Sequence, residues 1–353
     1  MRVTLAALKS HALACSLFRP TTLEKAIKRL GFVQADPIRS PARAQDLILR
    51  HRVSRYRAGD LERHYPKLGL DEDYLYAYGF VPESTWRLLH PRLAKTLSAT
   101  ERRVLELVSA QTHVHPRELE THLGATREVN AWGGYSKATT RTLELLHFYG
   151  LLRVARRQNG IRLYEAQTRV ADTEPGLELK DRLGKLVLLI ARILQPMPER
   201  SLGATLVHLG HSAPHLEGRR SIVKELVAEG ELASAEMEGV RYVWPAGKLL
   251  RKAPEERVRF LAPFDPIVWD RRRFELFWGW AYRFEAYTPA AKRKLGYYAM
   301  PLLWKHEVVG WVNISNRGGK FEVEDGYAKG RPKGDVFRNA FKAEVERFRA
   351  FLQ

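Results

Sequence analysis

The chain has little cysteine and no long apolar run. Cys15 is the single cysteine among 353 residues, which excludes an internal disulfide framework and a cysteine-based zinc site. No apolar stretch is long enough to span a bilayer, and the residues after Met1 lack the charged-then-apolar order of a secretory signal. We therefore expect a cytoplasmic protein without a membrane partner.

Several common catalytic motifs are also missing. The sequence contains no Walker loop, no G-x-G-x-x-G turn after a strand, no H-E-x-x-H and no G-x-S-x-G. The pair His113 and His115 and the group His208, His211 and His215 have no carboxylate that completes a ligand set. We expect no metal and no other cofactor.

Positive charge is the strongest global property. The net charge is +19, and residues 1–60 hold 12 Lys and Arg against 4 Asp and Glu, a net charge of +8. Such a field attracts polyanions, and no basic amphipathic helix with a Trp or Leu face suits a membrane surface. Nucleic acid is the expected partner, although a generically basic, solvated surface would have the same composition.

A short segment of this basic region carries an amide and a carboxylate. Residues 31–37 read G-F-V-Q-A-D-P, and the proline favours extended backbone at Asp36. Gln34 and Asp36 would then project to one side, where they could activate water near a nucleic acid. From spacing alone, the simpler interpretation is that Asp36 caps a helix beginning near Pro37 or Ser40.

The periodicity predicts an α+β protein with two to three tandem winged helices and a small β-rich, barrel-like C-terminal domain. Residues 1–95 form a winged-helix-like domain, with helices over 4–14 and 23–30 and a basic helix opened by Ser40-Pro41. This first domain contains Gln34 and Asp36.

The remaining boundaries follow hairpin signals. Residues 96–175 form a second winged helix, with helices over 101–110, 116–123 and 137–149 before a hairpin turn at 158–160. Residues 176–250 repeat the pattern, with helices over 183–194 and 219–229 and a turn at 238–239. Residues 251–353 carry strand-like segments over 277–280, 282–287, 297–303 and 307–314 before a closing helix over 335–351.

Tandem winged helices are typical of transcription regulators, in which the third helix enters the major groove. Lys137 and Arg141 could read DNA in this way from the second winged helix. A non-catalytic DNA-binding regulator is therefore an alternative to an enzyme, although several unlike winged helices with a β-rich tail are unusual in a repressor.

Two separated motifs resemble those of the winged-helix DNA glycosylases of the crosslink-repair type, which are homologues of the azinomycin-resistance glycosylase. The first reads G-F-V-Q-A-D-P-I over 31–38 and A-R-A-Q-D-L-I-L over 42–49. The second reads L-A-P-F-D-P-I-V-W-D over 261–270 and is followed by G-Y-Y over 296–298. The order of the two motifs and the distance between them agree with those of these glycosylases, so the resemblance covers effectively the whole chain.

The resemblance implies a monofunctional DNA glycosylase of base excision repair, a hydrolase acting on N-glycosyl bonds. The family signature is Gln-apolar-Gln in the azinomycin branch and Gln-apolar-Asp in the crosslink-unhooking branch, so the resemblance makes Gln34 and Asp36 the expected catalytic residues. Many members also carry an acidic–aromatic pair and a histidine before a proline, whereas Tyr76 to Pro82 contains no histidine. The implied substrate is double-stranded DNA with alkylated bases or interstrand crosslinks, bound by a nucleoid-associated monomer.

The implied chemistry suits these residues. Alkylation at N7 makes a purine a good leaving group, so a carboxylate that stabilises the sugar cation and deprotonates water is sufficient. Gln34 could orient that water, and bulky lesions favour an open cleft over a closed base pocket. For the DNA backbone, the expected phosphate contacts are basic side chains that could equally form a solvated face: Arg43, Arg50, Arg52, Arg55 and Arg271. Arg317 belongs to the loop over 316–320, which could probe a DNA groove or simply be a turn.

Overall fold

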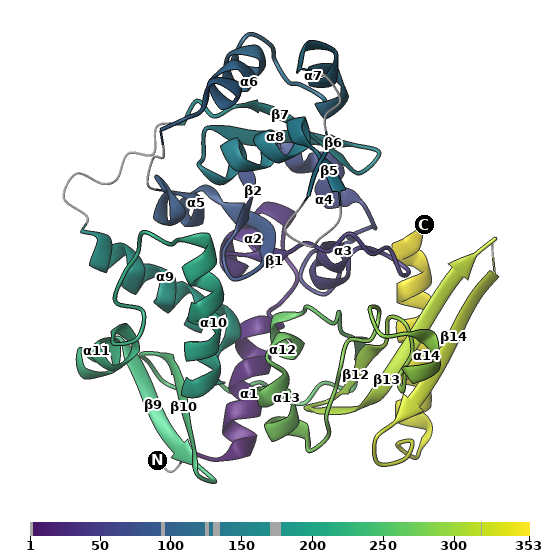
Figure 1. The fold of residues 1–353 in the computed structure, drawn as a ribbon. Coiled ribbons are helices and arrows are strands. Elements are labelled where there is room, and N and C mark those ends of the chain that lie inside the picture. Colours follow the sequence, from purple (N-terminus) through teal and green to yellow (C-terminus); the bar gives the residue numbers. More distant parts are fainter. Residues whose placement is uncertain (1–2, 93–95, 124–126, 130–134, 170–177, 319) are drawn as a thin grey trace. The chain divides into compact units, whose positions relative to one another are not determined.

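The structure is a computed structural model that describes residues 3–92, 96–123, 127–129, 135–169, 178–318 and 320–353. Helices and several small sheets follow one another along the chain (Figure 1), so the protein is α+β, as predicted. The chain groups into two compact units. Unit 1 comprises Met1–Leu61, Val187–Val207 and Gly218–Gln353, and unit 2 comprises Glu62–Leu186 and His208–Glu217. These units do not follow the four expected domain boundaries, which stay a prediction.

Unit 1 begins with two capped helices. Thr4 accepts a hydrogen bond from a backbone N–H at the start of α1 (Leu5–Ser16), and Thr22 does the same for α2 (Leu23–Leu30). Gly31 ends α2 in the left-handed conformation, and β1 (Val33–Gln34) follows. The predicted helix over 23–30 and its glycine end are confirmed.

The third helix begins later than the sequence indicated. α3 (Ala44–Leu49) has Arg43 at its N-cap position, in extended backbone, without a side-chain cap. The helix predicted to open at Ser40-Pro41 is therefore wrong, because residues 40–43 remain outside regular structure.

The apolar core of unit 1 joins α1 to helices from the last third of the sequence. Side chains of α1 pack against α12 (Pro266–Trp269) and α13 (Arg271–Trp278), and Figure 1 shows these helices side by side. Asp265 and Asp270 cap the two short helices through backbone N–H groups. The 261–270 motif thus contains the N-cap residues of both helices, and apolar residues of the motif belong to this core. The core residues include Leu8, Leu13, Leu17, Tyr242, Leu261, Ile267, Phe274 and Phe277.

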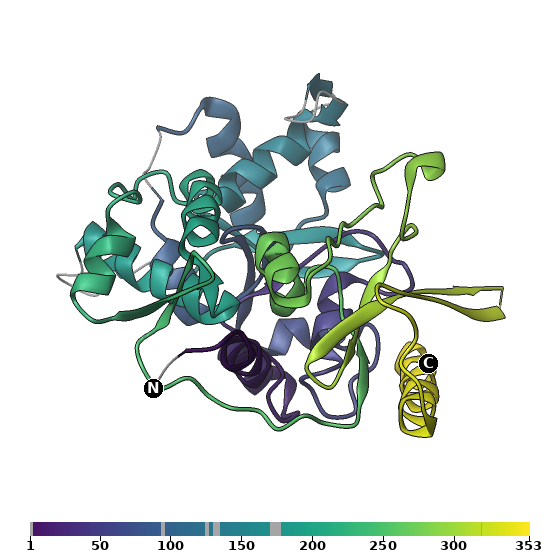
Figure 2. The same cartoon turned by 90° about the horizontal axis from the view of Figure 1, so that it is seen from below.

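Unit 1 also contains an antiparallel sheet in the order β11-β12-β13-β14, built from β11 (Val258–Phe260), β12 (Met300–Trp304), β13 (Glu307–Arg317) and β14 (Lys320–Tyr327). The order is linear, so these strands do not close into the expected barrel. In Figure 2 the far end of the β13–β14 hairpin extends beyond the other strands. The closing helix is confirmed as α14 (Asp335–Leu352), whose Phe341 ring packs on Phe260 of β11.

The strands expected over 277–280 and 282–287 are wrong. Phe274, Phe277 and Trp278 belong to α13, where a spacing of three and four residues buries them on one helical face. Gly279 ends that helix in the left-handed conformation, and residues 282–287 form no strand. Aromatic residues favour strands only statistically, and here their helical spacing decides the structure.

The hairpin predicted with its turn at 238–239 lies where it was expected. In unit 1, β9 (Leu232–Met237) and β10 (Val240–Pro245) join at Glu238-Gly239, and β8 (Met197–Pro198) pairs with β10. The helix expected over 219–229 is α11 (Ile222–Ala228). The unit boundaries fall within α9 (Leu179–Leu194) and α10 (Glu199–Ser212), and α10 was not predicted.

Unit 2 contains the helices and the hairpin expected for the second winged helix, in the expected order. They are α6 (Ala99–Ser109), α7 (Pro116–Leu123), α8 (Ala138–Phe148), β6 (Leu152–Gln158) and β7 (Ile161–Ala166). A short ladder of β4 (Arg127–Val129) and β5 (Tyr135–Lys137) interrupts them. The winged-helix interpretation stays a prediction.

Unit 2 starts with a hairpin of β2 (Leu70–Tyr74) and β3 (Tyr78–Pro82), followed by α5 (Glu83–Leu89). α4 (Asp60–His64) lies where the division between the units falls. Throughout the described residues, no helix has the length and apolar character needed to cross a membrane.

Candidate active site

Gly31 sets the path of the chain into the candidate site. Its φ of +76° belongs to the left-handed region that glycine adopts most easily. A Cβ atom at this position would lie 2.6 Å from Leu189 Cδ1, so a side chain would also collide with α9. Phe32 and Val33 are buried immediately after the turn. These anchors fix the backbone that carries Gln34 and Asp36.

Asp36 holds a local turn rather than a helix end. One carboxylate oxygen, Oδ1, accepts a hydrogen bond of 2.9 Å from the backbone N–H of Ile38, which is the pattern of an Asx turn. The next helix does not begin until Ala44, so the helix-cap interpretation of Asp36 is wrong. Burial raises the pKa of Asp36, and the Ile38 N–H partly opposes that rise.

Gln34 lies two residues before this carboxylate, at the end of β1. Its Oε1 atom is buried and has no hydrogen-bond partner among the residues that the structure describes. A buried carbonyl oxygen without a partner is uncommon in folded proteins, and it can still accept a hydrogen bond from a ligand. The pair therefore offers a half-buried carboxylate and an unoccupied acceptor within three residues.

Tyrosines from the C-terminal part of unit 1 complete the surroundings of Asp36. Burial, and after it the Asp36 carboxylate, raise the pKa of Tyr298 well above its ordinary range and also raise the pKa of Tyr287. Tyr298 is only 3% exposed, whereas Tyr287 is 76% exposed, and Phe284 contacts both rings. Both phenols therefore stay protonated at neutral pH, near the catalytic pair that the sequence predicted.

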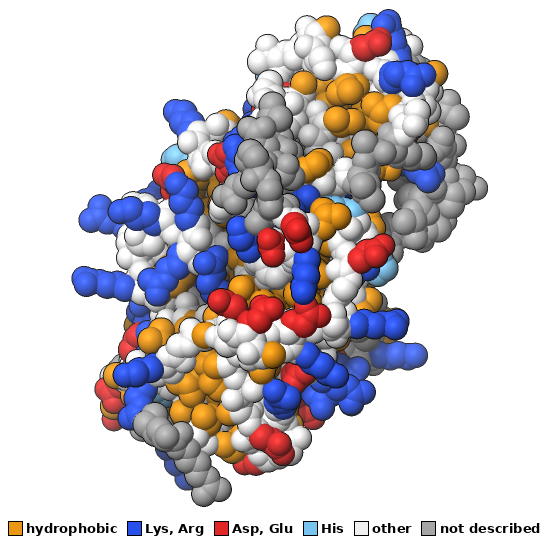
Figure 3. Space-filling model, turned by 90° about the vertical axis from the view of Figure 1, so that its left-hand side faces the viewer, with side chains coloured by type: hydrophobic (Ala, Val, Ile, Leu, Met, Phe, Trp, Pro, Cys, Tyr) orange, Lys and Arg blue, Asp and Glu red, His pale blue; other side chains and the backbone are white. Residues whose placement is uncertain are grey.

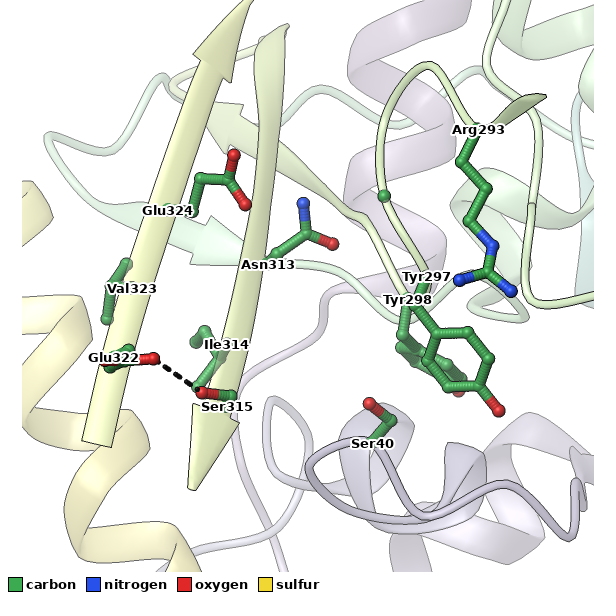
Figure 4. Close-up of a pocket in the computed structure, with 11 residues that line it drawn as sticks. Ser40, Arg293, Tyr297, Tyr298, Asn313, Ile314, Ser315, Glu322, Val323 and Glu324 are labelled. Carbon is green, nitrogen blue, oxygen red and sulfur yellow. Dashed lines mark hydrogen bonds between the residues drawn. The ribbon is translucent and has the colours of Figure 1, made fainter. Parts of the chain in front are cut away.

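Ser40 and Tyr298 line an open pocket of about 830 Å³. Figure 4 shows Ser40, Tyr297, Tyr298 and Arg293 on one side of it and residues of β13 and β14 on the other. The Arg293 guanidinium lies over the Tyr297 ring at 5.0 Å. The β13–β14 side is formed by Asn313, Ile314, Ser315, Glu322, Val323 and Glu324. Aromatic rings and polar groups thus meet beside the Gln34–Asp36 segment.

Two of the expected phosphate contacts are structural. Arg52 is completely buried, and its guanidinium binds both oxygens of Asp265 at 2.8 and 2.9 Å. Arg50 donates to the buried carboxylate of Glu344 at 2.8 Å. Neither side chain can reach DNA in this conformation, so their assignment to the phosphate set is wrong. The Arg52–Asp265 pair instead links the two motifs that resemble the glycosylases.

Arg271 and Arg43 are also held inside unit 1. Arg271 donates to the backbone oxygens of Val268 and Pro263 and lies over the Tyr282 ring, so its donors serve the fold. Arg43 is buried, and its charge acts on Asp46.

Three other predicted DNA contacts lie wholly or partly on the surface. Arg55 and Arg141 are exposed. Lys137 pairs with Glu120 at 2.7 Å and keeps 42% of its side chain exposed. The side chain of Arg317 lies outside the described residues. Figure 3 shows one face of the molecule, on which Lys and Arg side chains project mainly near the edges.

The described residues contain no group of three or more His, Cys, Asp and Glu side chains that could hold a metal ion. In the segment where many glycosylases of this kind carry a histidine, Tyr78 donates from its hydroxyl to Glu72 at 2.7 Å. This contact belongs to unit 2 and supports its fold.

Fold and site together define a mixed α+β protein with a carboxylate and an amide beside an open aromatic pocket. The family model described as DNA glycosylase AlkZ-like matches residues 27–351. The chain therefore belongs to the AlkZ-like DNA glycosylase family, as its two motifs predicted. This membership favours an enzyme that acts on DNA over the non-catalytic regulator.

The structure also identifies residues that sequence reasoning did not assign to the site. Tyr298 and Tyr287 lie near Asp36, and Tyr298, Arg293 and Ser40 line the pocket. The one available signal was the G-Y-Y triplet at 296–298, which contributed to the family resemblance without indicating a role.

Proposed function

We propose that the protein is a monofunctional DNA glycosylase that hydrolyses the N-glycosidic bond of N7-alkylated purines, including purines in interstrand crosslinks. Family membership supports the reaction class. The observation that carries the residue assignment is the state of Asp36. Its carboxylate is half-buried, one oxygen is fixed by Ile38, and it forms no ion pair among the described residues.

A carboxylate in this state can act as a general base. Partial desolvation raises its affinity for a proton, which brings its pKa closer to the pH at which the enzyme works. Because Ile38 occupies Oδ1, Oδ2 is the oxygen that faces a substrate water. The same negative charge stabilises the cationic sugar that develops during bond cleavage.

The reaction balances without a cofactor. The bond between C1′ and the purine nitrogen breaks, and its electron pair leaves with the cationic base, which becomes neutral. The oxygen of water bonds to C1′, and the water proton passes to Asp36 and then to solvent. An abasic site and a free alkylpurine result. No lysine belongs to the 31–37 motif, so a Schiff base and strand cleavage are not expected.

The open pocket supports a broad range of lesions. With about 830 Å³ and the exposed ring of Tyr297 in its wall, it leaves room for adducts that a closed pocket would exclude. The acidic side chains of β14 suit a base that carries positive charge. Arg55 and Arg141, exposed and basic, are the proposed backbone contacts to double-stranded DNA.

Release of N7-methylguanine from a duplex, measured by chromatography under single-turnover conditions, tests the proposed function. We expect wild-type protein to release the free base and leave an intact abasic strand until alkali is added. A crosslinked duplex tests the wider substrate range in the same assay. Wild-type protein that releases no base from either duplex would refute the proposal, and nicking without alkali would refute its monofunctional form.

A further inference from the structure

Tyr298 is the buried polar group beside Asp36 for which the fold gives no reason. Its ring is 3% exposed and packs against Phe284, with centroids 5.2 Å apart. Its hydroxyl is buried and has no hydrogen-bond partner in the described parts of the chain. Leaving a buried hydroxyl unpaired costs free energy that phenylalanine would not cost at the same position.

A second tyrosine of unit 1 shows the ordinary arrangement. Tyr282 is equally buried, at 1% exposed, but its hydroxyl donates to the backbone oxygen of Ala299 at 2.7 Å. Ala299 is the residue that follows Tyr298. The local backbone therefore accepts a hydrogen bond from the Tyr282 hydroxyl and leaves the Tyr298 hydroxyl without a partner. The first hydroxyl supports the fold, whereas the second can bind a ligand.

The free groups around Asp36 match the needs of one water molecule. A water has two protons and two lone pairs in a tetrahedral arrangement. Asp36 Oδ2 can accept one proton, and the buried Gln34 Oε1 can accept the other. One lone pair must point at C1′ for attack. The remaining lone pair requires a donor, and the Tyr298 phenol, which stays protonated, is that kind of group.

We infer that Tyr298 is a positioning residue that donates a hydrogen bond to the attacking water held by Asp36 and Gln34. This role rests on the proposed glycosylase function and adds a third contact to it. Ser40, four residues after Asp36, lines the same pocket as Tyr298, as Figure 4 shows. All four residues belong to unit 1. With three contacts fixed, the water keeps a single lone pair free, and its orientation towards C1′ is set.

Tyr298→Phe tests the inference, with Tyr282→Phe as the matched control. We expect Tyr298→Phe to lower the single-turnover rate of base release about tenfold to a hundredfold, the effect of one lost hydrogen bond in a transition state. Its DNA affinity and its Tm should not fall, because the hydroxyl makes no contact in the free protein. Tyr282→Phe should lower Tm by a few degrees and keep the wild-type rate.

A double-mutant cycle provides a readout that a purely structural role would not change. If Tyr298 and Gln34 act on the same water, Tyr298→Phe should cost clearly less in a Gln34→Ala background than in wild type. An undiminished cost, a rate of Tyr298→Phe within about twofold of wild type, or a lowered Tm would each overturn the inference. The wild-type rate reports separately on the proposed function, and wild-type protein without activity would refute both.

Discussion

Asp36 in unit 1 and Asp73 in unit 2 are both partly or fully buried aspartates, yet their surroundings are opposite. Asp73, on β2, is 1% exposed and accepts hydrogen bonds from His90 at 2.7 Å, Arg92 at 2.9 Å and the backbone N–H of Tyr74. Burial opposes its ionisation, but Arg92 and His90 hold the pKa of Asp73 below its ordinary value. Asp36 has one backbone donor, no cation, and a raised pKa.

The difference separates a carboxylate that maintains a fold from one that can do chemistry. Around Asp73 the Arg92 guanidinium and the His90 ring both donate to the carboxylate, so the charge is stabilised and has little tendency to take a proton. Around Asp36 the nearby polar groups Gln34 Oε1 and the Tyr298 hydroxyl have no partners in the described chain. Unused hydrogen-bonding capacity beside a desolvated charge is the feature expected of a catalytic site.

Replacing Asp36 should produce the largest effect on activity. Asp36→Asn keeps an oxygen for the Ile38 N–H, so the turn should survive while the charge is lost. We expect base release to slow by about a hundredfold to ten-thousandfold, the range for a general base. Single-turnover release from methylated duplex measures the effect, with DNA affinity followed in parallel. A wild-type rate of base release in Asp36→Asn would show that Asp36 is not the general base.

Replacing Asp73 should produce the largest effect on stability. Asp73→Asn leaves the buried Arg92 guanidinium without its counter-ion, and breaking such a pair costs about 3–5 kcal/mol. Urea denaturation followed by circular dichroism measures the change. Asp335→Asn is the matched control, since Asp335 is exposed on α14 and pairs only with an exposed Arg338. That control should stay within about 0.5 kcal/mol of wild type.

The two aspartates should contribute to the pH dependence of stability with opposite signs. This effect should be smaller than the two described above. Asp73 has a lowered folded-state pKa, so its ionised form stabilises the protein above its unfolded-state pKa, and this stability is lost as pH falls through the folded-state value. Asp36 has a raised pKa, so its stabilising contribution is present at low pH and is lost as pH rises through the folded-state value.

Asp36→Asn should therefore have a Tm at or above wild type at neutral pH, and the difference should close below about pH 4. Asp73→Asn should have a lower Tm at neutral pH, with the deficit shrinking only at lower pH than for Asp36. Thermal melts of the three proteins across this range provide the measurement. Two curves that move in the same direction would contradict the comparison.

The sequence predicted elements wherever local signals agreed with their surroundings. The threonine cap and glycine end of α2, and the turns at Asn159-Gly160 and Glu238-Gly239, are fixed by nearby residues and were predicted correctly. The strand predicted from Phe277 onwards is wrong because the helical spacing of its aromatic residues outweighs their statistical preference for strands. Whether the helices and hairpins form winged helices is a question of packing that local patterns leave open.

The site was predictable only in part, for a related reason. Gln34 and Asp36 form a motif, and a motif can be read from neighbours in the sequence. Tyr298 reaches Asp36 through the fold, more than 250 residues along the chain, and no spacing rule connects them. Arg50 and Arg52 were wrongly predicted as phosphate contacts because their partners are also distant in the sequence. These partners, Glu344 and Asp265, lie 294 and 213 residues away along the chain, so an apparently free basic face is an internal ion-pair network.

The composition of unit 1 has a consequence for the protein during its synthesis. Met1–Leu61 is synthesised before Gly218–Gln353, which supplies the core around α12 and α13 and the ring of Tyr298. A nascent chain that ends before Gly218 therefore carries Asp36 without that core and without Tyr298. On the proposed role of Asp36, we expect a fragment that ends before Tyr298 to release no base.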